Sequence, residues 1–213
     1  MWCSEAGSRA SLIGPCARSP FATAPAHLVP ARHRPLPDLL GRRLLARAHP
    51  GRLPPPADGL VDRPLTLTYD QLTAELRSGP CKDFQCVTGW RVEDVPWKGV
   101  RLADVLDRAG VQEPATAIRL YSFDGVYTES LTLGQARADD VLVAYEMEDK
   151  PVTTPHGGPV RLYVAQMYGY KSLKWLDRIE VTDELVPGYW EELGYDIDAF
   201  VGRSNGRNDK PVR

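Results

Sequence analysis

Residues 118–145 read IRLYSFDGVYTESLTLGQARADDVLVAY, and this stretch decides the fold. Ile118–Phe123 predicts a strand, Asp124-Gly125 is a hairpin turn signal, and residues 126–130 predict the returning strand. The run Val141–Tyr145 is apolar throughout and predicts a strong strand. Antiparallel strands that follow one another closely indicate a domain built around β-sheet.

The sequence on either side adds short elements of both kinds. Leu102, Val105, Leu106 and Ala109 recur at helical spacing, and Gly110 is a C-terminal stop for that helix. The other predicted elements are strands at 64–68, 83–87, 160–164 and 175–181, a short helix through Leu72 and Leu76 that begins at Thr68 or Asp70, and a helical turn at 135–138. We therefore predict an α+β domain of mixed β-sheets with short helices. The elements show no regular β-α-β alternation and no strand precedes a glycine-rich phosphate loop, which argues against the doubly wound dinucleotide fold.

The overall composition excludes several classes of protein. The 213 residues have a formal net charge of −2, 43% of them are hydrophobic, and 4 are Cys. A near-neutral balance gives no reason to expect nucleic acid or an anionic membrane as the main partner. Four Cys are too few for a disulfide scaffold, and no apolar run approaches the length of a membrane-spanning helix.

Residues 1–57 differ from the rest of the chain. They hold eight Arg, no Lys and two acids, hence a charge of +6, which leaves −8 for residues 58–213. Ten of the 19 Pro also lie there. This composition predicts a disordered leader before a folded domain at 58–213. Two alternatives remain open: an export signal at Arg42-Arg43, although its apolar run is short, and a mis-set start, because such composition arises when a GC-rich gene is read out of frame.

Few residues after the leader could carry chemistry. They include one histidine, His156, and two cysteines, Cys81 and Cys86, in C-x4-C spacing, which is too few for a Cys/His zinc site. No serine lies in a G-x-S-x-G elbow. Taken alone, Cys86 fits a buried small hydrophobic residue, and His156 fits a turn residue.

The segment 156–175 gathers positive charge around glycine and serine. Arg161, Lys171 and Lys174 would ordinarily form a solvated face. They also suit an anion, because arginine offers a planar fork, lysine a point charge, and glycine lets backbone amides approach. The spacing leaves both interpretations open.

Several motifs together resemble a known family. In chain order they are Cys86-Val-Thr-Gly-Trp90, Trp97-Lys-Gly-Val100, Val141–Met147, His156-Gly-Gly-Pro-Val-Arg161, Tyr168–Trp175 and Pro187–Tyr195. This order is similar to the molybdenum-cofactor domain of the sulfite oxidase family over residues 58–205. The resemblance is nearest to short bacterial members, which have the cofactor domain without a dimerisation domain. It implies a sulfite-oxidase-type molybdopterin-binding fold.

The resemblance also assigns roles to individual residues. Cys86 matches the cysteine whose thiolate binds molybdenum, and a thiolate is a soft, strongly donating ligand. The positions that hold the pterin and its phosphate match His156, Arg161, Ser172 and Lys174, and Asp124 falls near a polar pterin contact. Tyr195 matches the active-site tyrosine; the alternative for it is a packing aromatic.

The implied function is oxygen-atom transfer by a molybdenum–molybdopterin oxidoreductase on a small oxoanion, sulfoxide or related oxide. The sequence has no haem or iron–sulfur motif, so a separate haem or flavin redox partner is expected to exchange the electrons. The expected location is the cytoplasm, or outside it if an upstream signal has been lost. The alternative is a cofactor-binding homologue without turnover, because residues 1–57 do not resemble the cofactor-contacting segment with which family members begin.

Overall fold

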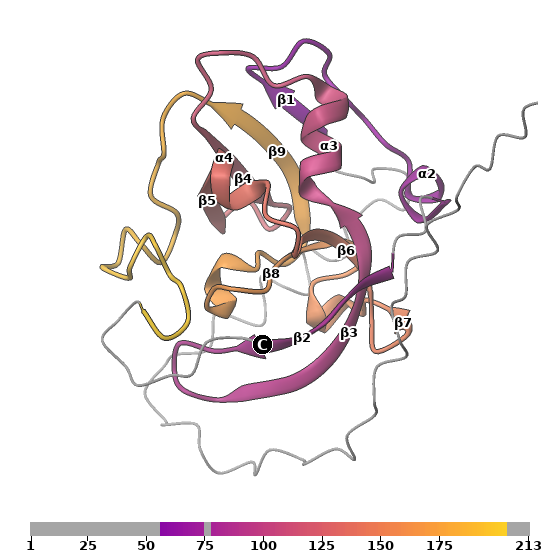
Figure 1. Ribbon diagram of the computed structural model, residues 1–213, viewed down its shortest axis with the longest axis vertical. Coiled ribbons are helices and arrows are strands. Elements are labelled where there is room, and N and C mark those ends of the chain that lie inside the picture. The colour runs from indigo at the N-terminus through magenta and orange to yellow at the C-terminus, as the bar shows by residue number, and fades with distance from the viewer. Residues whose placement is uncertain (1–55, 75–77, 204–213) are drawn as a thin grey trace, which may run out of the picture.

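Two β-sheets make up most of the chain that the computed structural model describes, residues 56–74 and 78–203 (Figure 1). The first sheet has the order β1-β9-β4-β5, formed by β1 (Ala57–Gly59), β9 (Leu176–Thr182), β4 (Ala117–Ser122) and β5 (Thr128–Thr132). The second has the order β2-β3-β6-β7 with β8 also paired to β6, formed by β2 (Ser78–Gln85), β3 (Arg91–Arg101), β6 (Val141–Met147), β7 (Lys150–Pro151) and β8 (Arg161–Val164). The paired strands are antiparallel except β1 with β9. The predicted α+β class with mixed sheets is confirmed.

The helices are short, as predicted, although the helical turn predicted at 135–138 begins and ends two residues earlier. They are α2 (Tyr69–Ala74), α3 (Leu102–Ala109), α4 (Leu133–Ala136) and two 3-10 turns, η1 (Thr154–His156) and η2 (Gly169–Lys171). Thr68 begins α2, because its hydroxyl accepts a bond from the Gln71 amide. Gly110 ends α3 with a φ of 74°, and its N–H donates to Leu106. Among the described residues, no helix has the length and apolar character needed to cross a membrane.

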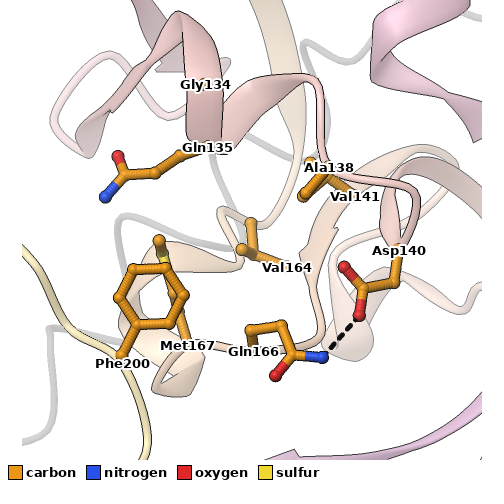
Figure 2. Close-up of a pocket in the computed structure, with 9 residues that line it drawn as sticks. All are labelled: Gly134, Gln135, Ala138, Asp140, Val141, Val164, Gln166, Met167 and Phe200. Atoms are coloured by element: carbon orange, nitrogen blue, oxygen red, sulfur yellow. Dashed lines mark hydrogen bonds between the residues drawn. The ribbon is translucent and has the colours of Figure 1, made fainter. Parts of the chain in front are cut away.

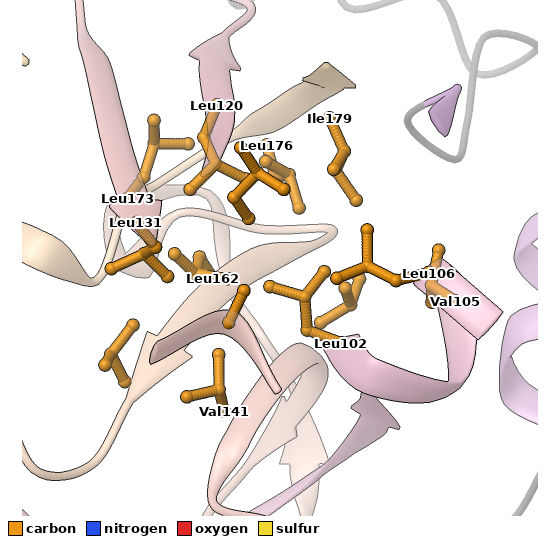
Figure 3. Close-up of a cluster of buried hydrophobic side chains, with 14 of the residues drawn as sticks. Leu102, Val105, Leu106, Leu120, Leu131, Val141, Leu162, Leu173, Leu176 and Ile179 are labelled. Atoms are coloured by element: carbon orange, nitrogen blue, oxygen red, sulfur yellow. The ribbon is translucent and has the colours of Figure 1, made fainter. Parts of the chain in front are cut away.

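The main core joins α3 to both sheets. From α3 it takes Leu102, Val105 and Leu106, which pack against side chains of both sheets such as Leu120, Leu162 and Ile179 (Figure 3). The strand β6 is buried on both faces: Val143 and Tyr145 belong to the main core, whereas Leu142 and Ala144 belong to a second cluster with Trp97 and Tyr163. Two buried faces explain why β6 reads as a continuous apolar run.

One long strand, β3, was not predicted. It spans Arg91–Arg101 and pairs with β2 and β6, and in Figure 1 it runs directly into α3. Pro96 and Gly99 lie in its interior and residues 92–94 are exposed, so its local composition argues against a strand. Pairing with β6, forty residues on, overrides that preference.

Three predicted strand positions need correction. Residues 64–68 form no strand; Leu65 exchanges both backbone bonds with Ala57, and no neighbouring pair among the described residues continues the ladder. The strand predicted at 83–87 is β2, which ends at Gln85, so that Cys86 lies in the turn that follows. The strand after the Asp124-Gly125 turn is β5, Thr128–Thr132, two residues later than predicted.

Candidate functional site

Cys86 lies at the start of a tight turn between β2 and β3. Its N–H donates to the Trp90 carbonyl at 2.9 Å, and the Gly89 N–H donates to the Cys86 carbonyl at 3.0 Å. Gly89 has a φ of 102°, which favours glycine. The thiol of Cys86 is free and half-buried, with its sulfur 3.1 Å from the Thr88 hydroxyl. The turn therefore presents a thiol that is fixed by backbone bonds and is not sealed in the core.

A polar network beneath this turn holds its shape. The Gln85 side-chain amide donates to the carbonyls of Cys86 at 2.9 Å and Trp90 at 3.2 Å. Its oxygen accepts a bond of 2.6 Å from Arg91, which also pairs with Asp83 at 3.2 Å. Gln85 is buried, so these bonds are shielded from water. The sequence carried no signal for this role, since a glutamine beside a cysteine fits no motif.

Replacing Gln85 with leucine is expected to loosen the Cys86 turn. The two carbonyls lose a buried donor, which costs about 1–3 kcal/mol of the free energy of unfolding. Urea unfolding measures the loss, and peptide mass spectrometry after alkylation should show faster modification of Cys86. The exposed Gln112 provides the matched control, Gln112→Leu. Alkylation of Cys86 at an equal rate in the two variants would contradict the role of Gln85.

Arg161, on β8, is buried and bound entirely to backbone oxygens. Its guanidinium donates to the carbonyls of His156 at 2.7 Å, Ser172 at 2.9 Å and Leu162 at 3.3 Å. Within the described residues no carboxylate pairs with it. Burial lowers the pKa of Arg161 to about 10, so the group stays charged at neutral pH. A buried cation without a counter-ion produces a positive potential that favours a bound anion.

Phe84 connects this arginine to the cysteine turn. The Arg161 guanidinium lies 5.6 Å from the centre of the Phe84 ring, which is two residues before Cys86. The same ring lies against Gly169, where an added Cβ would come within 2.4 Å of it. Gly169 therefore allows η2 to approach β2, the strand that precedes Cys86.

Lys174 extends the positive region toward the surface. Its ammonium donates to the Pro155 carbonyl at 2.7 Å and lies 5.9 Å from the Trp175 ring centre. Partial burial and then the charge of Arg161 lower the pKa of Lys174. An added Cβ at Gly157, whose φ is 98°, would meet the Lys174 side chain at 2.7 Å. The His-Gly-Gly sequence thus lets the 154–158 turn pack directly against Lys174.

His156 and Ser172 lie on either side of Arg161. His156 is exposed at the end of η1, and its Nδ1 lies 2.8 Å from the Thr153 hydroxyl. Ser172 is buried, and its hydroxyl oxygen accepts a bond of 3.0 Å from the Val164 N–H. Both carbonyls are held by Arg161. The ring of His156 is exposed, and the nitrogen that does not contact Thr153 can meet a ligand. The Ser172 side chain mainly fixes the loop.

Asp124 has a local structural role. Its carboxylate accepts bonds of 2.9 Å from the amides of Val126 and Tyr127, which closes the loop between β4 and β5. The preceding residue, Phe123, donates its N–H to the Trp175 carbonyl, and the two rings are 5.8 Å apart. The loop thus lies beside Lys174, but the bonds of Asp124 are those of a turn residue.

Lys171 does not join the positive cluster. Its ammonium is fully buried and donates to Glu129 at 2.6 Å, to Glu191 at 2.7 Å and to the Ser130 carbonyl at 2.8 Å. All three of its hydrogens are used. The solvated-face interpretation is therefore wrong for Lys171 and for the buried Arg161, and Lys171 is not available to an external anion. We call Glu129, Lys171 and Glu191 the buried triad.

The buried triad predicts a dependence of stability on pH. Burial raises the pKa of Glu129 to about 8 from an ordinary value of 4.5. Between about pH 4.5 and pH 8 the folded chain keeps a proton on Glu129 that the unfolded chain has released. The stabilisation that Glu129 contributes to the free energy of unfolding therefore falls as the pH rises from about 4.5 to about 8. The slope is at most about 1.4 kcal/mol per pH unit for one proton. Urea unfolding from pH 5 to 9 measures it. Glu129→Gln should show a shallower slope, and equal slopes would refute the assignment.

Tyr195 lies in an aromatic group that follows β9. Its ring centre is 5.5 Å from that of Tyr170 and 5.2 Å from that of Trp190. The residue is half-buried, and within the described chain its hydroxyl has no hydrogen-bond partner. The ring of Tyr195 thus packs against aromatic neighbours, as the alternative interpretation expects, whereas its hydroxyl is available to a ligand.

A pocket of about 170 Å³ lies elsewhere, between α4, the end of β8 and Phe200 (Figure 2). Its walls are mainly apolar, and Gln166 donates to Asp140 across its edge at 2.8 Å. None of the predicted site residues lines it. The pocket therefore does not coincide with the predicted site.

The structure thus brings the predicted cofactor-binding residues together: Arg161 bonds the carbonyls of His156 and Ser172, and Lys174 bonds that of Pro155 next to His156. The loop of Asp124 lies beside them. Cys86 connects to the group through Phe84, and Tyr195 through Tyr170, which is two residues before Ser172. Within residues 56–74 and 78–203, no three His, Cys, Asp or Glu side chains gather as a metal site.

Comparison with known proteins identifies the family. The model of the oxidoreductase molybdopterin binding domain matches residues 56–190. The chain is 40% identical over 137 residues to the uncharacterized oxidoreductase YuiH of Bacillus subtilis, covering 64% of this chain and 69% of YuiH. It is 35% identical over 114 residues to the mitochondrial sulfite oxidase of Drosophila melanogaster, covering 49% of this chain and 20% of that protein.

Two further proteins extend the comparison. The catalytic subunit MsrP of the protein-methionine-sulfoxide reductase of Gluconobacter oxydans is 30% identical over 173 residues, 72% of this chain and 54% of that protein. This chain therefore spans only about half of MsrP and a fifth of sulfite oxidase. Among solved structures, the sulfane dehydrogenase SoxCD of Paracoccus pantotrophus matches with a TM-score of 0.58 at 23% identity, over 62% of this chain and 38% of that one, which shows a shared fold. The chain belongs to the oxidoreductase molybdopterin-binding domain family and is an oxidoreductase of the sulfite oxidase type.

Proposed function

We propose that this chain binds a molybdenum–molybdopterin cofactor and transfers an oxygen atom to or from a small oxoanion, sulfoxide or related oxide. The observation that carries the proposal is the buried Arg161, which has no carboxylate partner among the described residues and lies beside Lys174. An anionic pterin phosphate would supply the missing negative charge. The donor set fits such a group, since it combines two cations, an exposed imidazole and a fixed loop backbone.

Cys86 would supply the protein's ligand to the metal. Its thiol is free and half-buried, and a thiolate is the soft donor that suits this chemistry. When bound, the cofactor supplies a metal centre that exchanges two electrons and an oxygen atom with substrate. The turn closed by Gln85 would keep the sulfur in one orientation, which is the role of the outer shell of a metal site.

Tyr195 would contact the substrate through its hydroxyl. Asp124, in contrast, already bonds two backbone amides, and we propose that it orders the loop beside Lys174. MsrP is named as a catalytic subunit. By analogy, a separate haem or flavin protein would exchange electrons with this chain. The cytoplasmic location inferred from the sequence stays a prediction.

Dye-linked turnover tests the reaction class. Purified chain that contains molybdenum is assayed with sulfite and a dye oxidant, and with methionine sulfoxide or trimethylamine N-oxide and a dye reductant. Turnover of at least one of these, lost in Cys86→Ser, is the expected result. Molybdenum-loaded chain that turns over none of the three would favour the alternative of a cofactor-binding homologue without turnover.

A further inference from the structure

The C-terminal segment 187–195 is fastened to the hairpin of the first sheet. The Tyr189 N–H donates to the Thr128 carbonyl at 3.0 Å. An added Cβ at Gly188 would lie 2.7 Å from the same carbonyl and 2.9 Å from the Cα of Glu129, so only glycine allows this approach. In Figure 1 the segment follows β9, in yellow, on the side of the molecule where β5 lies.

The buried triad adds charged contacts between the C-terminal segment and the hairpin. Lys171 comes from η2, Glu129 from β5 and Glu191 from the C-terminal segment, and their side chains are at most 2% exposed. The Oε2 atoms of Glu129 and Glu191 are buried without a hydrogen-bond partner among the described residues. Removing one member of a buried charged group leaves the others without compensation, which is strongly destabilising. The triad therefore ties three segments that are distant in sequence to one point.

Glu191 in turn controls the position of Tyr195. A tight turn joins them, in which the Gly194 N–H donates to the Glu191 carbonyl at 2.9 Å and the Tyr195 N–H donates to the Trp190 carbonyl at 3.1 Å. On the other side of the triad, Lys171 directly follows Tyr170, whose ring packs against Tyr195 and whose hydroxyl donates to the Asp196 carbonyl at 2.5 Å. The two rings that contact Tyr195, those of Tyr170 and Trp190, therefore each belong to a residue next to a member of the triad.

We propose that the Glu129–Lys171–Glu191 triad is a positioning device that fixes the ring of Tyr195, and with it the hydroxyl that the proposed function assigns to substrate. The expected effect on kcat rests on the proposed function. The expected effect on the order of residues 192–195 rests on the geometry alone. Tyr195 would be the catalytic residue, because its hydroxyl would touch substrate. Glu191 and Lys171 would act only through it.

Hydrogen exchange of the full chain tests the structural half. Glu191→Gln keeps the shape of the side chain and removes its charge; the neighbouring exposed residue gives the control, Glu192→Gln. The amides of residues 192–195 should exchange at least about tenfold faster in Glu191→Gln, whereas β4 and β9 stay unchanged. Equal rates in the two variants, or a uniform acceleration along the chain, would overturn the proposal. If Glu191→Gln does not fold, Glu191→Asp keeps the charge with a shorter reach and should show the same local acceleration.

Kinetics of the molybdenum-loaded chain test the functional half. Glu191→Gln should lower kcat with little change in KM, and adding it to Tyr195→Phe should cost no more than Tyr195→Phe alone. Local loosening with an unchanged kcat would overturn the positioning role. If the wild-type chain turns over no substrate, the proposed function fails, and the exchange experiment still decides whether the triad holds Tyr195.

Discussion

Replacing Cys86 with serine should lower kcat at least about 100-fold, because even changes outside the ligand shell of a metal site cost 10- to 100-fold. The thiol is free and the turn around it is closed by its own backbone bonds and by Gln85. Serine keeps this geometry but offers a harder oxygen donor. The pterin contacts proposed for Arg161 and Lys174 do not involve the sulfur, so the cofactor should stay bound.

Dye-linked turnover and molybdenum content, measured on the same preparation, check this prediction. Thr88→Ala is the matched control, since it removes the hydroxyl 3.1 Å from the sulfur and leaves the thiol in place. It should reduce kcat by about tenfold, the lower end of the range for changes outside the ligand shell. An unchanged kcat in Cys86→Ser at the same molybdenum content would remove Cys86 as the ligand.

Replacing Lys171 with methionine should give a large loss of stability, about 3–5 kcal/mol of the free energy of unfolding. Methionine fills a similar volume but leaves Glu129 and Glu191 without a cation and the Ser130 carbonyl without a donor. Because Glu129 already holds a proton near neutral pH, the buried Glu191 carboxylate loses its cation and must take up a proton as well. The loss should therefore shrink in acid, where protonation costs less.

Urea unfolding of Lys171→Met at two pH values checks this result. Lys150→Met is the control, since Lys150 is exposed on β7 and its replacement should cause no measurable change. A difference below about 1 kcal/mol between Lys171→Met and the wild-type chain would mean that the triad contributes little to stability.

The sequence predicts those elements whose own residues determine them. The helix α3 has apolar residues at helical spacing and a glycine stop, and β6 has apolar residues on both of its faces, so both could be predicted. The strand β3 could not, because Pro96 and Gly99 disfavour a strand locally and only the pairing with β2 and β6 stabilises it. Residues 64–68 show the opposite case. Their alternating pattern predicts a strand, but only Leu65 pairs with another backbone segment, at Ala57.

The same distinction holds for the site. Cys86, His156, Arg161 and Lys174 are chemically distinctive types in motifs of recognisable spacing. The sequence does not reveal that Lys171 is withdrawn from the positive cluster, because its partners Glu129 and Glu191 are 42 and 20 residues away. Gln85 likewise gains its role from the carbonyls that it meets after the hairpin has formed.

The most direct test of the account is the metal and pterin content of the purified chain, expressed in a host that makes the cofactor. Elemental analysis and the fluorescence of the oxidised pterin should give roughly one molybdenum and one pterin per chain. Arg161→Met should lower both together, because the buried charge that would attract the phosphate is lost. Less than about 0.1 molybdenum per wild-type chain would contradict the claim that this domain is built to hold the cofactor.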